Sequence, residues 1–199
     1  KTTLYHFVID QSGSMAGMEA LAIGGFNTQL QTIQTLQKEK PAETFLCSLT
    51  LFNSDVVDVL RQAPVEKLIA LSDGYFRPSG STSLLDALGK SIYNIKEQFG
   101  NDIAEDKMSV VMVIITDGHE NSSRMYTYHD IAQLIKTLDE TDKWTFSFLG
   151  ADFDAIHTSQ MLNIRRENAM SYSKTSYSEM MYDLSDSIKA YSNSKSDGK

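Results

Sequence analysis

The chain has 199 residues, of which 41% are apolar and 22% are charged, a mixture typical of a folded domain with its own core. Its formal net charge is −8, from 18 basic and 26 acidic residues, and no dense cluster of Lys and Arg offsets the excess acid. This balance argues against nucleic acid as a partner, because a polyanion would be repelled on average. No run of about 18 apolar residues occurs either, so we expect no membrane insertion.

Apolar strands and amphipathic helices alternate along the first half of the chain. An apolar run at 5–9 predicts a strand, and the helical pattern that follows it ends before Pro41. A second strand is expected near 44–52. The three-residue link at 53–55 allows only a tight hairpin, so the strand that starts at Val56 must run antiparallel, and we place it at the sheet edge.

The same alternation continues in the second half. The remaining predicted elements are a short helix at 64–69, helices near 84–99, 127–140, 153–160 and 178–191, a polar loop at 100–107, and strands near 109–115, 144–149 and 168–172. Repeated strand–helix alternation predicts a mainly parallel sheet with helices on both faces. We expect a single domain over residues 1–191 and a flexible tail over 192–199.

Polar residues follow the first strand at the point where it should end, in the run Asp10-Gln11-Ser12-Gly13-Ser14. Such a run can aim three oxygens at one point, and oxygen-only ligands on a turn suit a hard divalent cation such as Mg²⁺. The same residues also suit a turn and helix cap with no ligand, in which Asp10 or Ser12 is the capping residue. Taken alone, the run leaves both interpretations open.

Two distant segments favour the metal site. The apolar strand at 110–115 ends in Thr116-Asp117-Gly118, which puts a second carboxylate at a strand end. A hydroxyl-rich loop, Ser79-Gly80-Ser81-Thr82-Ser83, opens the helix near 84–99. An Asp-x-Ser-x-Ser run, then a loop Thr, then Asp-Gly after a Val/Ile strand resembles the metal-ion-dependent adhesion site (MIDAS) of von Willebrand factor type A (vWA) domains. The resemblance covers roughly residues 3–190.

This resemblance implies a Rossmann-like, doubly wound α/β fold. Its six-stranded, mainly parallel sheet would have the order 3-2-1-4-5-6, with strand 3 antiparallel. The strands that end in Asp10 and Asp117 would then be neighbours, about 4.8 Å apart, at the point where strand order reverses and where ligands bind in such sheets. The metal residues implied are Asp10, Ser12, Ser14, Thr82 and Asp117. We expect Mg²⁺ or Mn²⁺, with Ca²⁺ a poorer fit because it prefers more oxygens at longer distances.

The resemblance also implies a protein-binding function. Three neutral hydroxyl ligands leave the ion underneutralised, so an exposed Asp or Glu of a partner protein would complete its coordination. Arg and aromatic side chains are favoured at interfaces. The rim residues expected to contact the partner are Arg77, His119, Asn121, Arg124 and Tyr126.

The cellular setting is inferred from the same resemblance. Compact members without a signal segment resemble bacterial intracellular proteins that work beside ATPases or stress-response systems. The single cysteine, Cys47, cannot form an internal disulfide, which favours a reducing compartment. We therefore expect a cytoplasmic protein.

An enzyme is the weaker hypothesis. A haloacid-dehalogenase-like phosphatase also carries an Asp at the end of its first strand, but it needs a second carboxylate at the position of Ser12. Residues 13–17 lack the spacing of a nucleophile elbow, and His119-Glu120 is not followed by a second His at zincin spacing. We expect no catalysis, and the alternative is a divalent-metal-dependent, phosphatase-like enzyme.

Overall fold

The computed structural model of the chain describes residues 1–117, 119–151, 154–173 and 175–196. Six strands form one sheet in the order β3-β2-β1-β4-β5-β6, in which only β3 runs antiparallel to its neighbour. The strands are β1 (Thr2–Asp10), β2 (Thr44–Phe52), β3 (Val56–Pro64), β4 (Met108–Thr116), β5 (Trp144–Ala151) and β6 (Ala169–Tyr172). The predicted fold class, strand order and direction are therefore confirmed.

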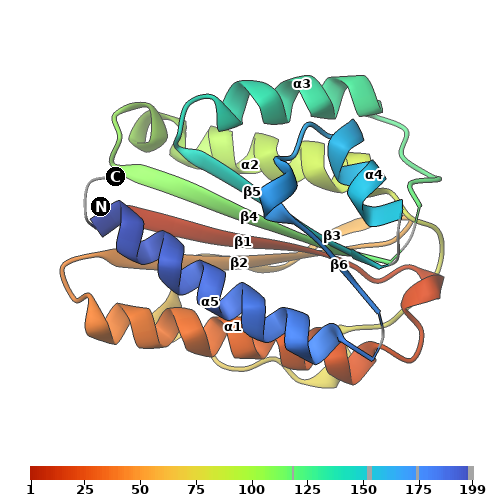
Figure 1. The fold of residues 1–199 in the computed structure, drawn as a ribbon, viewed down its shortest axis with the longest axis horizontal. Helices are drawn as coiled ribbons and strands as arrows, with labels where there is room; N and C mark the ends of the chain where they lie inside the picture. Colours follow the sequence, from red (N-terminus) through yellow and green to blue (C-terminus); the bar gives the residue numbers. More distant parts are fainter. Residues whose placement is uncertain (118, 152–153, 174, 197–199) are drawn as a thin grey trace.

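Helices cover both faces of this sheet, with α1 and α5 on one face and α2, α3 and α4 on the other (Figure 1). The α-helices are α1 (Glu19–Glu39), α2 (Leu84–Ala104), α3 (Tyr128–Asp139), α4 (Asp154–Met161) and α5 (Tyr177–Ser196). Short 3-10 turns are η1 (Gly13–Met15), η2 (Val65–Lys67), η3 (Asp73–Tyr75) and η4 (Arg166–Asn168). No helix within the described ranges is both long and apolar enough to cross a bilayer.

The central strands are mostly apolar because they are buried on both faces. Every residue of β4 is buried. Successive side chains of β1 point to opposite cores: Phe7 and Ile9 pack beneath α1 and α5, whereas Leu4 and Val8 pack beneath α2 and α3. Two apolar layers thus hold the sheet rigid and fix where its strands end.

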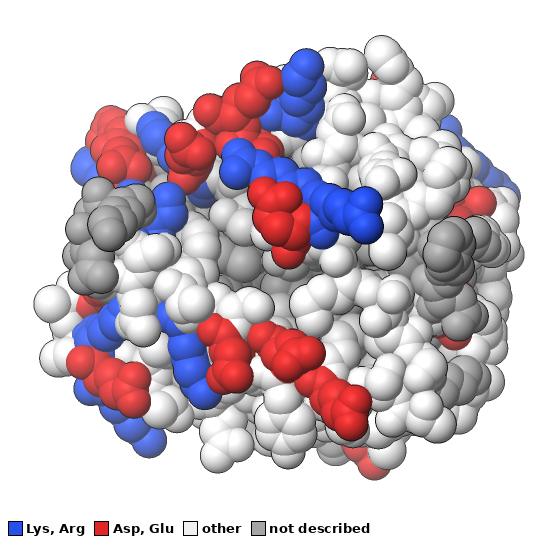
Figure 2. Space-filling view, viewed as in Figure 1, with Lys and Arg blue, Asp and Glu red and all other residues white. Residues whose placement is uncertain are grey.

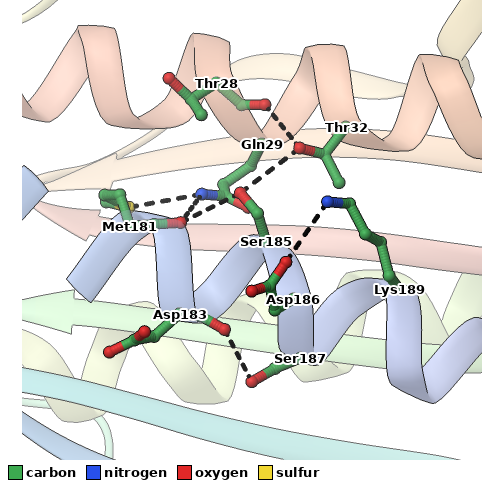
Figure 3. Close-up of polar contacts among 9 residues, drawn as sticks. All are labelled: Thr28, Gln29, Thr32, Met181, Asp183, Ser185, Asp186, Ser187 and Lys189. Carbon is green, nitrogen blue, oxygen red and sulfur yellow. Dashed lines mark hydrogen bonds and ion pairs between the residues drawn. The ribbon is translucent and has the colours of Figure 1, made fainter. Parts of the chain in front are cut away.

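Helix α5 lies along α1, and the contact between them is partly polar (Figure 3). Gly25 lets the helices approach closely, since a Cβ at this position would meet Met181 Cε at 2.7 Å. The buried Gln29 amide is satisfied at both ends: its Nε2 donates to the Met181 carbonyl at 2.7 Å, and its Oε1 accepts from Ser185 Oγ at 3.1 Å. These bonds specify the position of α5 along α1.

Two helices extend further than the sequence predicts. Helix α2 continues to Ala104, through part of the expected polar loop, and α5 continues to Ser196 instead of ending at 191. Ser192 is buried and accepts a hydrogen bond from Lys40 Nζ at 2.9 Å. Packing on the neighbouring segments therefore outweighs the weak helix propensity of this polar stretch. Residues 192–196, which the sequence analysis assigned to a flexible tail, thus belong to α5, and residues 197–199 lie outside the described residues.

Charged side chains of both signs lie near one another on the side of the molecule that Figure 2 shows. In this view α3 and α4 lie above the sheet and α5 and α1 below it, and acidic and basic residues are interspersed in both parts. Although the chain has a net charge of −8, this side therefore does not form one acidic field.

Candidate metal centre

The polar ends of β1 and β4 lie side by side at the carboxyl edge of the sheet. The two strands pair in parallel with Ile9 opposite Ile115, so Asp10 and Thr116 are the next residues of each strand. Thr116 Oγ1 donates to Asp10 Oδ2 at 2.6 Å, which joins the two strand ends. The predicted proximity of the two acidic segments is thus present in the structure.

Asp10 is fully buried, although it is a carboxylate. Its Oδ1 accepts the Ser12 backbone N–H at 2.6 Å, and its Oδ2 accepts from Thr116. Burial raises the pKa of the Asp10 carboxyl, these hydrogen bonds oppose the rise, and the nearby negative charge of Asp117 adds to it. A buried carboxylate beside a second one is costly in water-free surroundings, and a divalent cation would relieve both effects.

A row of short oxygen contacts runs from the Asp-x-Ser-x-Ser loop to the end of β4. Ser14 Oγ donates to Asp117 Oδ1 at 2.7 Å, so its hydrogen is used there and it accepts from Ser12 Oγ at 3.0 Å. The six oxygens around an octahedral Mg²⁺ lie about 2.05 Å from the ion and therefore about 2.9 Å from their neighbours. The spacing of these three side chains fits that ligand shell.

Thr82 lies in the loop that precedes α2, and it is buried. Backbone bonds tie this loop to the Asp-x-Ser-x-Ser loop: Gly13 N–H donates to the Gly80 carbonyl at 3.1 Å, and Ser79 N–H donates to the Gln11 carbonyl at 2.9 Å. Gly80 has a φ of 71°, and a Cβ there would meet Ser54 Oγ at 2.7 Å, so this turn requires glycine. The structure thus brings the loop of Thr82 against that of Ser12 and Ser14.

The loop after β4 holds Thr82 from the other side. Asn121 Oδ1 accepts the Thr82 N–H at 2.9 Å, and the Thr82 carbonyl accepts from the N–H groups of Asn121 at 3.0 Å and Ser122 at 3.2 Å. Three hydrogen bonds therefore connect Thr82 to the segment that begins at Asp117.

Two carboxylates whose roles the sequence did not predict, Glu120 and Asp86, connect the start of α2 to the loop after β4. Glu120 accepts the backbone N–H groups of Leu85 at 3.0 Å and Ser123 at 2.7 Å, so it caps the first turn of α2. Asp86, on that same turn, accepts three N–H groups from residues 124–126 at 2.9–3.1 Å. Acidic residues at a helix start are a recognisable signal, but their partners lie 35–40 residues away and are invisible in sequence.

The five predicted rim residues differ in their exposure and in the contacts they make. Arg77, His119, Asn121 and Arg124 are exposed. Asn121 Oδ1 is already bonded to Thr82, so its carbonyl oxygen serves the loop. Tyr126 is only half-exposed and its ring packs on α2, where a Cβ at Gly89 would meet it at 2.4 Å. The rim assignment remains a prediction, and Tyr126 offers less surface than expected.

Hydroxyl groups make up more than half of the candidate ligand set, which separates it from a His- or Cys-based site. Across the residues that the structure describes, no group of three or more His, Cys, Asp or Glu side chains is placed to hold a metal ion. The candidate donors are two carboxylates, Asp10 and Asp117, together with the hydroxyls of Ser12, Ser14 and Thr82. All are oxygen donors, as a hard divalent cation prefers.

No protein-family model matches the sequence, and the search of curated proteins finds no significant match. Solved structures do match: a von Willebrand factor type A protein from Catenulispora acidiphila is 16% identical, with a TM-score of 0.60, over 93% of this chain and 42% of its own. The vWF domain of the type V pili tip protein Mfa5 from Porphyromonas gingivalis is 10% identical, with a TM-score of 0.66, over 94% of this chain and 95% of its own.

A third match, proximal thread matrix protein 1 (PTMP1) from the mussel byssus, has a zinc-occupied MIDAS motif. It is 13% identical with a TM-score of 0.61, over 92% of this chain and 44% of its own. The chain spans less than half of the length of the first solved structures that it matches. The fold of this chain is that of a von Willebrand factor type A domain.

Proposed function

We propose that the chain is a metal-dependent protein-binding module. The observation that carries this proposal is the row of oxygens from Ser12 through Ser14 to Asp117, spaced at 3.0 and 2.7 Å beside the buried Asp10. A plain helix cap does not explain it, because the turn after Ser12 has no side-chain cap and the Ser14 hydroxyl instead bonds to Asp117, which follows β4. The zinc-occupied MIDAS of PTMP1 supports a divalent ion at the corresponding place.

Asp10, Ser12, Ser14, Thr82 and Asp117 are the residues that would hold the ion, with Mg²⁺ or Mn²⁺ as the proposed species. When bound, the ion supplies a Lewis-acidic centre with a sixth coordination position open to an oxygen from outside the chain. Both oxygens of Asp10 already accept protein hydrogen bonds, which favours a role for this carboxylate through water. Ser14 is exposed, so the centre is open to a partner on that side.

The proposed partner is a protein with an exposed Asp or Glu at its binding surface. Two carboxylates and three neutral hydroxyls leave such a site able to accept one more anionic oxygen. Arg77 and Arg124 are exposed, and their positive charges would attract an acidic segment of a partner. A cytoplasmic partner such as an ATPase or a stress-response protein is proposed from the family resemblance alone. No observation favours the phosphatase-like alternative, since Ser12 occupies the position of its second carboxylate.

Calorimetry on chelator-treated protein tests the metal part of this proposal. We expect one Mg²⁺ or Mn²⁺ site in the wild type, lost in Asp10→Ala and in Asp117→Ala. Asp102→Ala, an exposed carboxylate on α2, is the matched control and should bind as the wild type does. Equal binding by all four proteins would reject the assignment.

A pull-down with and without chelator tests the partner. Captured protein should be released by chelator and reduced by Thr82→Ala, which removes the buried loop hydroxyl of the proposed ligand set. If neither chelator nor Thr82→Ala changes capture, the partner binds outside the candidate metal centre, and the loop at 119–128 is the next surface to test.

A further inference from the structure

A second polar site lies on the sheet, between the edge strand β3 and helix α2. It is a crevice of about 390 Å³ lined by residues of β1, β2, β3 and α2, and it shares no residue with the candidate metal centre. Most of its lining is polar or charged, including His6, Thr50, Asp58, Arg61, Asn94 and Glu97. Cavities of about 300–1,000 Å³ are the usual size of small-molecule sites.

The floor of the crevice is a polar patch where a parallel sheet is normally apolar. His6, Ser48 and Thr50 are each at most 3% exposed, yet they lie on the inner strands β1 and β2. His6 Nδ1 and Ser48 Oγ are 2.7 Å apart. Burial lowers the pKa of His6 to about 4, so the imidazole is neutral at physiological pH.

The donors and acceptors of the hydrogen bonds in this patch can be assigned in order, from Ser48 to Asp58. Thr50 Oγ1 donates its hydrogen to Asp58 Oδ1 at 2.8 Å, so it accepts from His6 Nε2 at 3.5 Å. A neutral imidazole that carries its hydrogen on Nε2 accepts at Nδ1, and Ser48 is then the donor there. The chain Ser48–His6–Thr50–Asp58 therefore ends on a carboxylate that lines the crevice.

Irregular pairing of β3 turns charged side chains toward this crevice. Thr50 pairs with Asp58 while the preceding Leu49 pairs with Leu60, so Val59 is an extra, bulged residue. In a regular strand Asp58 and Arg61 would point to opposite faces of the sheet. With one extra residue between them they share a face, and both line the crevice. Bulges that re-aim side chains are common next to functional sites.

The charges around the crevice do not neutralise one another. Asp58 and Arg61 lie on β3, and Glu97 lies opposite on α2 beside Asn94, whose Nδ2 is 3.5 Å from Asp58 Oδ2. Among the described residues, no ion pair joins Asp58, Arg61 or Glu97 to an opposite charge. Two carboxylates and a guanidinium, all on exposed side chains, therefore surround one hollow without pairing, as they would for a ligand that carries both signs of charge.

We propose that this crevice binds a small zwitterion, a free amino acid or a short peptide, with its ammonium at Asp58 and Glu97 and its carboxylate at Arg61. Free amino acids and short peptides share this chemistry and differ in the distance between the two charges. The polar lining matches a polar ligand, and the neutral His6 network forms the floor on which Asp58 is fixed. The site does not depend on the metal centre.

Thermal shift followed by calorimetry, with the standard amino acids and a panel of Gly-X dipeptides as probes, tests this proposal. We expect one of the two panels to contain binders and the other to bind more weakly, which identifies the source of the zwitterion. Asp58→Asn and Arg61→Gln should each weaken binding at least about tenfold, since each removes one charged contact. Glu66→Gln and Lys67→Gln make the same charge changes on exposed residues just beyond β3 and should bind as the wild type does.

The outcome is independent of the metal function, because Asp10→Ala should retain full binding of the zwitterion. If a crevice variant fails to fold, NMR of the wild type decides instead: bound ligand should shift the Asn94 side-chain amide and the His6 ring signals. The proposal is overturned if no probe in either panel binds, which would leave a crevice filled by water only. It is equally overturned if binding persists in both Asp58→Asn and Arg61→Gln, or if the His6 and Asn94 signals do not move.

Discussion

The candidate metal centre and the β3–α2 crevice are both polar sites on one sheet, but they are built in different ways. The candidate metal centre lies where β1 and β4 end, and its donors are the last residue of β1, Asp10, and residues of loops that leave the sheet. The crevice lies on a sheet face, and its charges are turned toward it by a bulge in β3. A site at strand ends leaves a motif in the sequence, whereas a site that depends on strand register does not.

The largest expected effect concerns the floor of the crevice. The folded-state pKa of His6, about 4, lies below its unfolded value of 6.5, so between these values the unfolded state binds more protons. Stability present above pH 6.5 is therefore lost as the pH falls toward 4, by on the order of 3 kcal/mol. Urea unfolding between pH 4 and 6.5 measures this effect. The free energy of unfolding should depend less on pH in His6→Asn, whereas a substitution of the exposed His129, His129→Asn, should leave the wild-type pH dependence unchanged. If the free energy of unfolding depends on pH identically in wild type and His6→Asn, the buried imidazole is not the group that titrates.

A divalent ion bound at the candidate metal centre should stabilise the folded protein by a similar amount. Asp10 and Asp117 repel each other without a cation, so Mg²⁺ at about 100 times its dissociation constant should add roughly 2.7 kcal/mol to the free energy of unfolding. Denaturation with Mg²⁺ and with chelator measures this gain. It should vanish in Asp10→Ala and persist in Asp58→Asn, and a gain that survives in Asp10→Ala would contradict the assignment.

A smaller effect is expected from the loop that holds Thr82. Asn121→Ala removes the acceptor of the Thr82 N–H, and we expect metal affinity to fall about fivefold, near 1 kcal/mol. In a Thr82→Ala background the same change should have no further effect on metal binding, because Asn121 acts through Thr82. A purely structural role would instead give additive losses in a double-mutant cycle measured by calorimetry.

The smallest expected effect concerns the charge of Asp117, which could destabilise the metal-free protein by repelling Asp10 or stabilise it by accepting from Ser14. Asp117→Asn keeps an oxygen that accepts from Ser14 Oγ but removes one of the two negative charges. In chelator its melting temperature should rise by roughly 1–3 °C. A fall would mean that the Asp117 charge stabilises the metal-free loop through its bond with Ser14.

The sequence predicted the elements whose signals are local. Apolar runs predicted most of the strands, the short link at 53–55 predicted the antiparallel one, and the family resemblance placed the Asp-x-Ser-x-Ser run, the Thr82 loop and Asp117 together at the sheet edge where the structure has them. The end of α5 was missed because Ser192 is buried against a partner 152 residues away, Lys40. The bonds of Glu120 and Asp86 and the bulge at Val59 were missed for the same reason, since each depends on pairing with a distant segment.

Anomalous diffraction from crystals grown with Mn²⁺ is the decisive test of the candidate metal centre, because it locates the ion without assuming its ligands. We predict one strong peak at the carboxyl ends of β1 and β4, in contact with Ser12 Oγ and Ser14 Oγ, with Thr82, Asp10 and Asp117 bound to the ion directly or through one water. A peak elsewhere on the protein, or no peak at Mn²⁺ concentrations that saturate calorimetric binding, would contradict it.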